Sequence, residues 1–407
     1  MRKIIVAALL AVGCAATQDA GDGFVPLFNG RDLSGWVRVN CGPDTFTVRD
    51  GTIVCSGKPT GVMRTERQYE NYVLELEWRH AKEGGNAGLF VHSGALPVCG
   101  VPFTRSIEVQ IMLGDAQDGS YTRHGDVFAI HGATFEPDRP HPKGWMRCLP
   151  SEKRVKGAGE WNHYRVECRD GRITLAVNGA VVSGGSSCDP QRGYICLESE
   201  GSEVRFRNLR IRGEPLPADD DAFAPLDFKM DDHWRARDWL IDYDGKGKDL
   251  WTEKEYGNFQ LVADWRLPRK PADTQRPVIK PDGSQEGTAV VPDAGDSGIY
   301  LRGSSKSQVN IWCWPVGSGE VYGYRTDANM SPGVRAGVTP KSREDRPPGQ
   351  WNRFVITMTD DRLTVMLNGK FVIENAQLPG VAPRGRIALQ SHGDPVQFAN
   401  LYIRELP

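Results

Sequence analysis

The sequence lacks an excess of charge, a membrane-spanning run and the common zinc motifs. Its 407 residues carry 50 Lys and Arg against 52 Asp and Glu, which gives a formal net charge of -2. A chain this close to neutral has no electrostatic basis for binding nucleic acid or anionic lipid. After the leader, charged residues or glycine interrupt every apolar run, which excludes a transmembrane helix. Neither C-x-x-C nor H-E-x-x-H occurs, so a zinc site made of cysteine or histidine has little support.

A helical period of 3.6 residues is also missing from every long segment. Short alternating runs separated by Gly, Pro, Asp and Asn dominate, which predicts an all-β protein. Asp170-Gly171 and Asn178-Gly179 are tight-turn dipeptides that flank one such run and predict hairpins. The long insert from Pro268 to Asp293 is rich in Pro, Asp and Gly, and we expect it to form a mobile loop.

One stretch of sequence occurs twice. GEWNHYRVECRDGRITLAVNGAVV from Gly159 returns from Gly349 as GQWNRFVITMTDDRLTVMLNGKFV, and Trp161 and Trp351 each stand 17 positions before an Asn-Gly pair. With the matching segments upstream and downstream, the repeat covers roughly 180 residues, which is the size of a domain. We therefore predict two tandem jelly-roll β-sandwich domains, at 23–213 and 223–407, joined by a linker at 214–222.

The first 20 residues have the three parts of a secretory signal. Arg2 and Lys3 precede an apolar run, which is followed by small residues. AVGC, ending at Cys14, resembles a bacterial lipoprotein box, although ordinary cleavage near Ala16 is an open alternative. We expect an exported protein that is periplasmic, secreted or held at the cell surface by a lipid on Cys14.

Eight cysteines remain after Cys14, seven of them in the first copy of the repeat. Export permits disulfides, but seven cysteines cannot all pair within one domain. Cys99 and Cys148 are both expected in loops, which makes them the candidate pair for a bridge.

Strand alternation predicts which side chains share a face, because positions two apart point the same way. In the first copy it places His92, Glu108, Gln110, Glu198 and Glu200 on the face opposite the core. The second copy has polar or aromatic residues at the corresponding positions, and these are Tyr300, Arg302, Gln308, Asn310, Trp312, Gln390 and His392. The agreement between the two copies favours a groove over an ordinary solvated sheet face.

FVPLFNGRDLSGW from Phe24, together with GNAGLFVHSG, SIEVQIML and VRFRNLRIR, resembles the bacterial 3-keto-disaccharide hydrolase family. The resemblance covers nearly all of the chain after the leader as two copies, although the second copy has no clean equivalent of LFNGRDLSGW. It implies a concanavalin A-like jelly roll with a concave, sugar-facing sheet. It also implies an exported protein that acts on glycosides already oxidised at C3 of the sugar.

Such a substrate sets clear chemical requirements. A ketone at C3 acidifies the hydrogen on C2, so a base can remove it, the C1 substituent can leave and water can add afterwards. The reaction needs a base near C2, an acid or metal near the leaving oxygen, and donors for the enolate.

Both copies offer candidate groups for this reaction. In the first copy these are His92, Glu108 and Glu200 as base, acid or metal ligands, with Asn86, Gln110 and Glu198 as binding groups. In the second copy they are His392 as base and Arg302 as enolate clamp, with Asp296, Tyr300, Gln308, Asn310, Trp312 and Gln390 as binding groups. Which copy is catalytic, and whether it uses a divalent metal ion, stays open.

Two other functions compete with this interpretation. SIEVQIML is similar to the catalytic strand of laminarinase-type glucanases, whose spacing is E-x-D-x-x-E, but only Glu108 of the three acidic positions is present. A conventional retaining glycosidase would therefore have to take its carboxylate pair from different strands. The other alternative is a tandem lectin without catalysis, because jelly rolls often bind glycans and fold does not fix function. Under each of these interpretations the partner is a carbohydrate.

Overall fold

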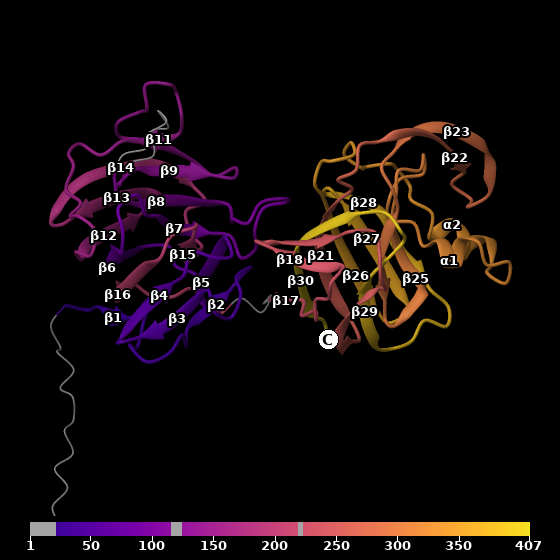
Figure 1. The fold of residues 1–407 in the computed structure, drawn as a ribbon, viewed down its shortest axis with the longest axis horizontal. Coiled ribbons are helices and arrows are strands. Elements are labelled where there is room, and N and C mark those ends of the chain that lie inside the picture. Colours follow the sequence, from indigo (N-terminus) through magenta and orange to yellow (C-terminus); the bar gives the residue numbers. More distant parts are fainter. Residues whose placement is uncertain (1–21, 115–123, 219–222) are drawn as a thin grey trace, which may run out of the picture.

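The computed structural model describes residues 22–114, 124–218 and 223–407, which form two β-sandwich domains in succession along the chain (Figure 1). The all-β, tandem jelly-roll prediction is confirmed. The predicted signal, including Cys14, lies outside the described residues, and so do positions 219–222 of the expected linker.

Domain 1 contains two sheets in its described residues. In spatial order, the nine-stranded sheet comprises β10 (Thr134–Pro137), β14 (Ala180–Asp189), β13 (Arg172–Val177), β12 (Asn162–Arg169), β6 (Tyr72–His80), β16 (Val204–Arg212), β4 (Thr52–Cys55) and β3 (Phe46–Arg49), with β1 (Val25–Pro26) beside β16. The seven-stranded sheet comprises β11 (Arg147–Cys148), β9 (Val127–Ile130), β8 (Ser106–Met112), β7 (Asn86–Ser93), β15 (Tyr194–Ser199), β5 (Gly61–Thr65) and β2 (Trp36–Arg38).

Domain 2 repeats this plan with a smaller second sheet in the part of the chain that is described. Its eight-stranded sheet comprises β18 (Trp234–Arg237), β19 (Leu240–Tyr243), β30 (Val396–Glu405), β21 (Phe259–Arg266), β26 (Asn352–Thr359), β27 (Arg362–Leu367) and β28 (Lys370–Gln377), with β17 (Ala224–Pro225) beside β30. Its four-stranded sheet comprises β20 (Leu250–Tyr256), β29 (Gly385–Leu389), β24 (Ser297–Leu301) and β25 (Ser304–Ile311).

Each domain has its own core because alternate residues of both sheets point inward. On β12, for example, Tyr164, Val166 and Cys168 are buried while the residues between them are partly exposed. Asn178 and Asn368 have positive φ angles and occupy equivalent turns, after β13 and β27 respectively. Their side chains make the same contacts to the strand before, so the duplication extends to individual hydrogen bonds.

The insert that was expected to be a mobile loop is instead a β-hairpin, formed by β22 (Ala272–Ile279) and β23 (Gln285–Asp293). Thr, Val and Ile residues in both segments favour strands, and the loop prediction gave too much weight to Pro and Gly. The helices of the described residues are short, namely α1 (Tyr322–Arg325) and α2 (Pro332–Gly337). None of the helices in these residues has the length and apolarity needed to cross a membrane.

The expected bridge between Cys99 and Cys148 is absent. Both cysteines are free, as are the other cysteines of the described residues. Cys148 is buried at the end of β11, where its thiol contacts backbone groups. Cys99 lies in the loop between β7 and β8, which points toward domain 2.

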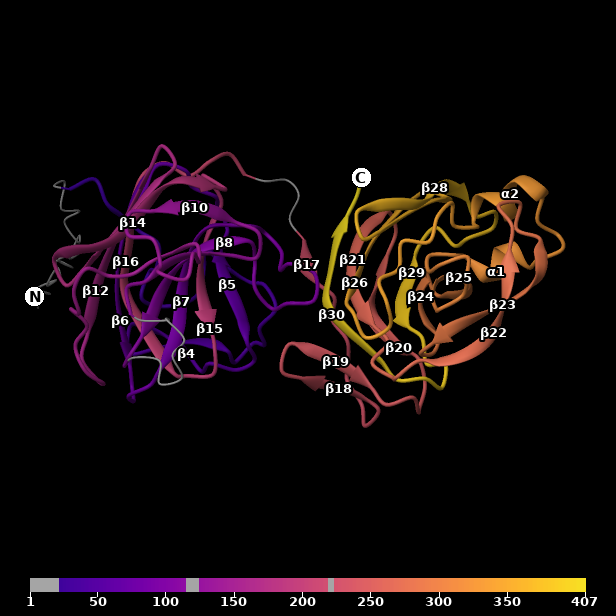
Figure 2. The ribbon, with the colours of Figure 1, turned by 90° about the horizontal axis from the view of Figure 1, so that it is seen from above.

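That loop, residues 94–105, forms the main contact between the domains. Asp264 of β21 accepts a hydrogen bond from Gly100 N–H at 2.9 Å, and Arg353 of β26 donates to Pro97 O at 2.8 Å. Asn400 of β30 donates to Val98 O and Val101 O. These strands lie on the side of domain 2 that faces domain 1 (Figure 2). The loop that connects β7 and β8 is therefore held by the second domain.

Candidate active site

The face of the seven-stranded sheet that points away from the core, which we call the front face of domain 1, carries the predicted carboxylates. Glu108 lies on β8 opposite Phe90 of β7. Glu198 lies on β15, one residue after Leu197, which pairs with Leu89 of β7. The antiparallel register therefore places Glu198 and Glu108 on either side of β7, as the alternation predicts.

Gly88 of β7 makes room for these two carboxylates. A β-carbon at Gly88 would lie 2.7 Å from Glu198 Oε2 and 2.8 Å from Glu108 Oε1, where real side chains are not found. The two oxygens can be no farther apart than the sum of these distances. The absence of a side chain at Gly88 therefore lets the carboxylates face one another across the strand.

Both carboxyl groups are removed from water. Glu108 is 6% exposed and Glu198 is 1% exposed. Burial, followed by the charge of Glu200, raises the pKa of Glu108 well above its ordinary value. Burial, followed by the charges of Glu108 and Glu200, does the same to the pKa of Glu198. Among the described residues no hydrogen-bond donor reaches Glu198 Oε2, so this carboxyl is suited to carrying a proton at neutral pH.

A cation beside Glu108 distinguishes it from Glu198. Arg147 of β11 forms an ion pair with Asp126 at 2.8 Å, and its guanidinium lies 3.8 Å from the centre of the Phe128 ring on β9. The positive charge of Arg147 opposes the upward shift in the pKa of Glu108. Arg147 was missed by the sequence analysis because it lies on a two-residue strand with no periodic pattern or motif.

Glu200, Asn86 and Gln110 form a chain of hydrogen bonds beside the carboxylate pair. Asn86 Nδ2 donates to Glu200, and Gln110 Nε2 donates to Asn86 Oδ1 at 2.6 Å. Glu200 is partly exposed, and burial raises its pKa. A cavity of about 330 Å³ is lined by the loops that precede Asn86 and follow Glu200. Five of the six first-copy candidates are thus brought together, and polar groups extend from the buried pair toward solvent.

His92 is the exception, and its predicted place on the front face is wrong. Its ring packs edge-on against Tyr72 of β6, in the core between the sheets, and Nδ1 lies 3.1 Å from Pro190 O. The backbone of His92 has a φ of 52°, and the pairing of β7 with β15 shifts register next to it. A left-handed residue reverses the alternation of side chains, which the sequence pattern could not show. Burial lowers the pKa of His92 to about 4.

The front face of domain 2 has the same geometry with different chemistry. Gly298 of β24 corresponds to Gly88, and Gln308 and Gln390 stand where domain 1 has Glu108 and Glu198. Gln308 Nε2 donates to Gln390 Oε1 at 2.6 Å. The carboxylate pair of domain 1 is therefore replaced by a neutral, hydrogen-bonded pair of amides.

His392 and Asp296 occupy the positions of Glu200 and Asn86. His392 Nδ1 lies 3.9 Å from Asp296 Oδ2, and the imidazole is half exposed. Burial raises the pKa of Asp296 to about 6, although the charge of His392 opposes the shift. Tyr300 is buried beside this group, with Gln390 and Asp249 close to its hydroxyl.

The other candidates of domain 2 have structural contacts. Arg302 lies away from the front face, because its guanidinium donates to Gly257 O at 2.9 Å and to Ala382 O at 3.1 Å. Its φ is 49°, so the same left-handed reversal that moves His92 makes the predicted placement of Arg302 wrong. Trp312 stacks on Trp314 and packs against Ile279 of the hairpin. Asn310 is 2% exposed, beside Gly298 on β25.

We found no cluster of metal-ligating side chains in the described part of the chain. Within residues 22–114, 124–218 and 223–407, no group of three or more His, Cys, Asp or Glu side chains is placed to hold a metal ion. The front faces therefore offer acid, base and hydrogen-bonding groups.

Comparison of the sequence with known protein families gives a match in both domains. The profile of the 3-keto-alpha-glucoside-1,2-lyase-like domain matches residues 23–212 and again residues 227–404. A solved structure from Parabacteroides distasonis, provisionally described as a glycosyl hydrolase, is 24% identical, covering 47% of this chain and 94% of that chain with a TM-score of 0.38. A second from the same organism is 25% identical, with coverages of 47% and 100% and a TM-score of 0.35. A carbohydrate-binding module from Bacillus subtilis is 12% identical, with coverages of 44% and 96% and a TM-score of 0.30. Comparison with curated proteins gives no match.

Proposed function

The chain belongs to the family of 3-keto-alpha-glucoside-1,2-lyase-like domains, as two tandem copies, and from this premise we propose that domain 1 cleaves glycosides that carry a ketone at C3. Membership makes the protein a carbohydrate-active hydrolase at the level of the family. The 3-keto substrate and the elimination mechanism are the proposal. The observation that carries it is the pair of buried carboxyl groups, Glu108 and Glu198, that face each other across Gly88.

The surroundings of the two carboxyls suggest a role for each. Burial raises the pKa of both carboxyls, but the Arg147 cation opposes this shift at Glu108 alone, which suits Glu108 better than Glu198 to act as the base at C2. Glu198 has no such cation, and burial followed by the charges of Glu108 and Glu200 raises its pKa, which suits it to act as the acid at the leaving oxygen. Two carboxyls whose environments separate their protonation states are the usual basis of an acid and base assignment.

The proposed reaction has two stages, an elimination and a hydration. Glu108 takes the C2 proton, and the electron pair of that bond passes through the enolate of the C3 ketone to form the C1–C2 double bond. The bond from C1 to the aglycone oxygen breaks, and that oxygen takes the proton of Glu198. Water then adds its hydroxyl to C1 and a proton to C2, so the net change is hydrolysis. The proton on C2 and the leaving oxygen on C1 are bound to adjacent carbons. The base and the acid must therefore lie close together, as Glu108 and Glu198 do on either side of Gly88.

Domain 2 supports a second function, namely sugar binding without cleavage. Gln308 and Gln390 cannot exchange protons as carboxyls do, but amides are good partners for sugar hydroxyls. Together with His392, Asp296 and Tyr300 they form a front face suited to recognition. We assign catalysis to domain 1 and binding to domain 2.

The decisive experiment compares a 3-keto glucoside with its unoxidised parent, using the purified protein with and without a chelator. We expect turnover of the keto form alone, with solvent deuterium entering C2 of the product. Glu108→Gln and Glu198→Gln should each lower the rate by about two to four orders of magnitude. Glu167→Gln, which changes a partly exposed carboxylate on β12, is the matched control and should leave the rate unchanged.

Three outcomes would lead to other conclusions. Equal turnover of the unoxidised parent would identify a conventional glycosidase. Sugar binding without turnover of either compound would leave a tandem lectin. Loss of activity with the chelator, in protein that stays folded, would replace Glu198 by a metal ion as the acid.

We also propose that the protein is exported, on the basis of its first 20 residues. Cell fractionation of the native host should find it outside the cytoplasm. A Cys14→Ser variant should move from the membrane to the soluble exported fraction if Cys14 carries a lipid. Cytoplasmic recovery of the full-length chain would contradict the proposal.

A further inference from the structure

Phe90 connects the carboxylate pair of domain 1 to the loop that domain 2 holds. It lies on β7 opposite Glu108, so its ring is on the front face. A β-carbon at Gly88 would lie 3.0 Å from the Phe90 ring, besides its close approach to both carboxylates. The ring therefore lies beside the pair. Although the front face points away from the core, Phe90 is 0% exposed, so a segment outside the sheet must cover it.

The loop between β7 and β8 provides this cover. Phe103 packs edge-on against Phe90, with ring centroids 5.8 Å apart. Leu96 packs on the same apolar cluster, which also contains Tyr402 of domain 2. The loop, residues 94–105, thus forms one wall of the front face and excludes water from that side of the carboxylate pair.

Domain 2 holds this loop directly across from Phe103. Phe103 O accepts a hydrogen bond from Val98 N–H at 2.9 Å, so these two residues face each other within the loop. Val98 O accepts from Asn400 of β30 at 3.3 Å, and the neighbouring Pro97 O accepts from Arg353 of β26 at 2.8 Å. The strand of the loop opposite Phe103 is therefore bound to domain 2.

The tip of the loop lies against domain 2 as well. Gly100 N–H donates to Asp264, and a β-carbon at Gly100 would lie 2.4 Å from the indole of Trp351. Asn40 of domain 1 donates to Pro102 O at 2.7 Å, so domain 1 anchors the arm that carries Phe103 at one point. The tip and the opposite arm have their anchors in domain 2.

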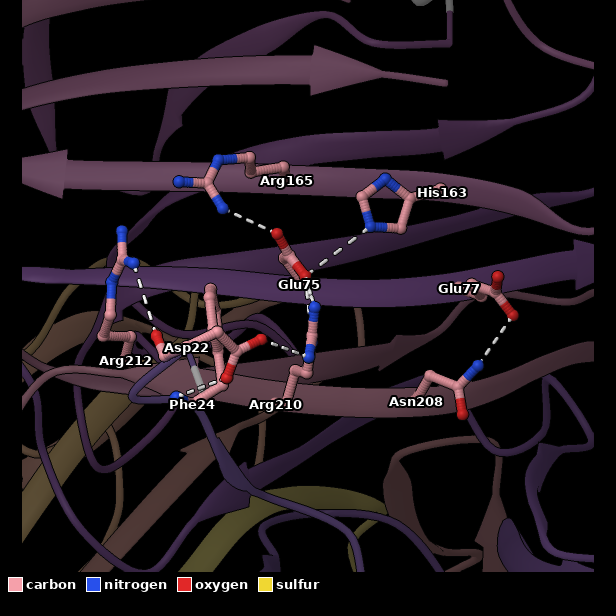
Figure 3. Close-up of polar contacts among 9 residues, drawn as sticks. All are labelled: Asp22, Phe24, Glu75, Glu77, His163, Arg165, Asn208, Arg210 and Arg212. Atoms are coloured by element: carbon pink, nitrogen blue, oxygen red, sulfur yellow. Dashed lines mark hydrogen bonds and ion pairs between the residues drawn. The ribbon is translucent and has the colours of Figure 1, made fainter. Parts of the chain in front are cut away.

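The face of the large sheet that points away from the core, which we call the back face, differs between the domains in accordance with this role. In domain 2, Val262, Val355 and Tyr402 of the back face belong to or pack on the apolar cluster that includes the loop. Equivalent strand positions in domain 1 carry an ion-pair network (Figure 3), formed by Glu75, Arg165 and Arg210. The back face of domain 2 is therefore apolar where it meets the loop, whereas that of domain 1 is charged and partly exposed to water.

The charges around the carboxylate pair come from other segments. Besides Glu108 and Glu198 themselves, the titratable groups that influence the pKa of either carboxyl are Glu200, Asp126, Arg147 and Cys55. None of these four lies in the loop, and burial is the largest cause of both pKa shifts. A change in the loop will therefore act on the pKa of the two carboxyls through their hydration.

We propose that domain 2 is a working part of the domain 1 site, because its contacts with the loop hold Phe103 against Phe90 and so keep water away from the carboxylate pair. The inference rests on the proposed function, in which the two carboxyls are the base and the acid. Phe103 and the residues of domain 2 that anchor the loop are positioning residues, since they act through Phe90.

Phe103→Ala tests the loop with a measurement that does not depend on turnover. Calorimetric unfolding of the full-length Phe103→Ala protein, with and without Glu198→Gln, is followed from pH 4 to pH 9. Water in place of the ring should lower the pKa of Glu198 by about one unit, so the stability difference caused by Glu198→Gln should stop growing about one pH unit lower than in the wild type. Phe103→Leu, which keeps an apolar side chain, should restore most of the wild-type behaviour. Phe371→Ala removes an exposed aromatic ring from β28 and is the matched control.

The rate on a 3-keto glucoside should respond in the same direction. Both limbs of the pH profile should move to lower pH by about one unit in Phe103→Ala, because both carboxyls become more hydrated. Above the pKa of Glu198 the protonated fraction, and with it kcat, should fall by up to about tenfold. A purely structural defect would lower the rate without moving the profile.

Gly100→Ala tests the part that domain 2 plays. Its β-carbon would meet Trp351, so the tip must leave domain 2, and the pH shift should match that of Phe103→Ala. In the double variant the two changes should not add, because they act through one contact. Gly30→Ala is the matched control, since Gly30 has a similar φ of 76° and its β-carbon would meet no atom of the described residues within 4 Å.

Asn400→Gly is a second test on the side of domain 2, and it decides the question if Gly100→Ala does not fold. It keeps the left-handed backbone and removes the donor to Val98 O, so it should shift the linkage in the same direction by a smaller amount. Asn375→Gly makes the same change at an exposed left-handed asparagine and should have no effect.

Three results would overturn the proposal. An unchanged proton linkage in Phe103→Ala would show that the loop does not control the hydration of the pair. A shift in Phe103→Ala but in neither Gly100→Ala nor Asn400→Gly would show that domain 1 holds the loop by itself. Additive shifts in the double variant would mean that the two residues act by separate routes. If the linkage shifts as expected but no keto glucoside is turned over, the proposed function fails while the role of domain 2 at the carboxylate pair is supported.

Discussion

Replacing Glu198 by glutamine should make domain 1 more stable at neutral pH while lowering the rate of the proposed reaction. The carboxyl of Glu198 is 1% exposed, and burial followed by the charges of Glu108 and Glu200 raises its pKa well above 4.5. The folded protein therefore holds a proton that the unfolded chain loses once the pH exceeds about 4.5. The contribution of Glu198 to the stability of the wild type therefore falls from this pH upward until the folded-state pKa is reached, and a glutamine escapes this loss because it does not titrate.

The size of the effect follows from proton linkage. One proton held in the folded state alone changes the free energy of unfolding by about 1.4 kcal/mol for each pH unit. For each pH unit above 4.5 over which Glu198 keeps its proton in the folded state, Glu198→Gln should gain about 1.4 kcal/mol relative to the wild type. For a domain of this size, each such unit corresponds to a difference of about 3 to 6 °C in Tm.

Calorimetric unfolding of the wild type and of Glu198→Gln, measured at intervals from pH 4 to pH 8, is the assay. The two proteins should unfold at similar temperatures at pH 4 and diverge as the pH rises. Gln390→Glu is the reciprocal variant, since it installs the same carboxyl in domain 2 and should lower stability progressively above pH 4.5. A difference between wild type and Glu198→Gln that does not change with pH would refute the inference that Glu198 is protonated in the folded state.

Three further predictions follow from the contacts. Gly88→Ala should lower turnover at least a hundredfold, because the new methyl would displace Glu108 and Glu198; equal activity in a folded Gly88→Ala protein would remove the pair from the mechanism, and Gly298→Ala in domain 2 is the matched control. The rate on a keto glycoside should show a bell-shaped pH dependence, since one carboxyl must be ionised and the other protonated; a rate that rises monotonically to pH 9 would contradict the assignment. Gly100→Ala should split one calorimetric unfolding transition into two, because it breaks the contact with Trp351; an unchanged single transition would show that the loop does not couple the domains.

Local patterns were sufficient to predict the fold. Period-two alternation and Asp-Gly or Asn-Gly turns act within a few residues, so they identified the strands and the duplicated hairpins correctly. The same alternation placed Glu108 and Glu198 on one face, because the buried neighbours of each fix the orientation of the strand. The distance between them could not be predicted, since it depends on the register of three strands that are far apart in the sequence.

The errors arose where the backbone departs from a regular strand. His92 and Arg302 both have positive φ, and each lies beside a shift in strand pairing. Strict period-two alternation therefore placed both side chains on the wrong face of the sheet. An arginine carries no sequence signal for this conformation and a histidine carries a weaker one than a glycine, so the alternation was followed through both positions. Arg147 was missed for a different reason, because it approaches Glu108 from a distant strand through tertiary contacts alone.

The comparison between the two copies explains why a duplicated domain can be useful here. A buried carboxyl pair is unfavourable for stability at neutral pH, because each charge must be desolvated and repels the other. Gln308 and Gln390 remove this penalty in domain 2 and keep the shape of the site around Gly298. Domain 2 is then free to stabilise its neighbour, and it does so at the loop that joins β7 and β8, the strands that carry Gly88 and Glu108. The stability lost at the buried carboxyl pair of domain 1 is thus offset in part by contacts that the second copy provides.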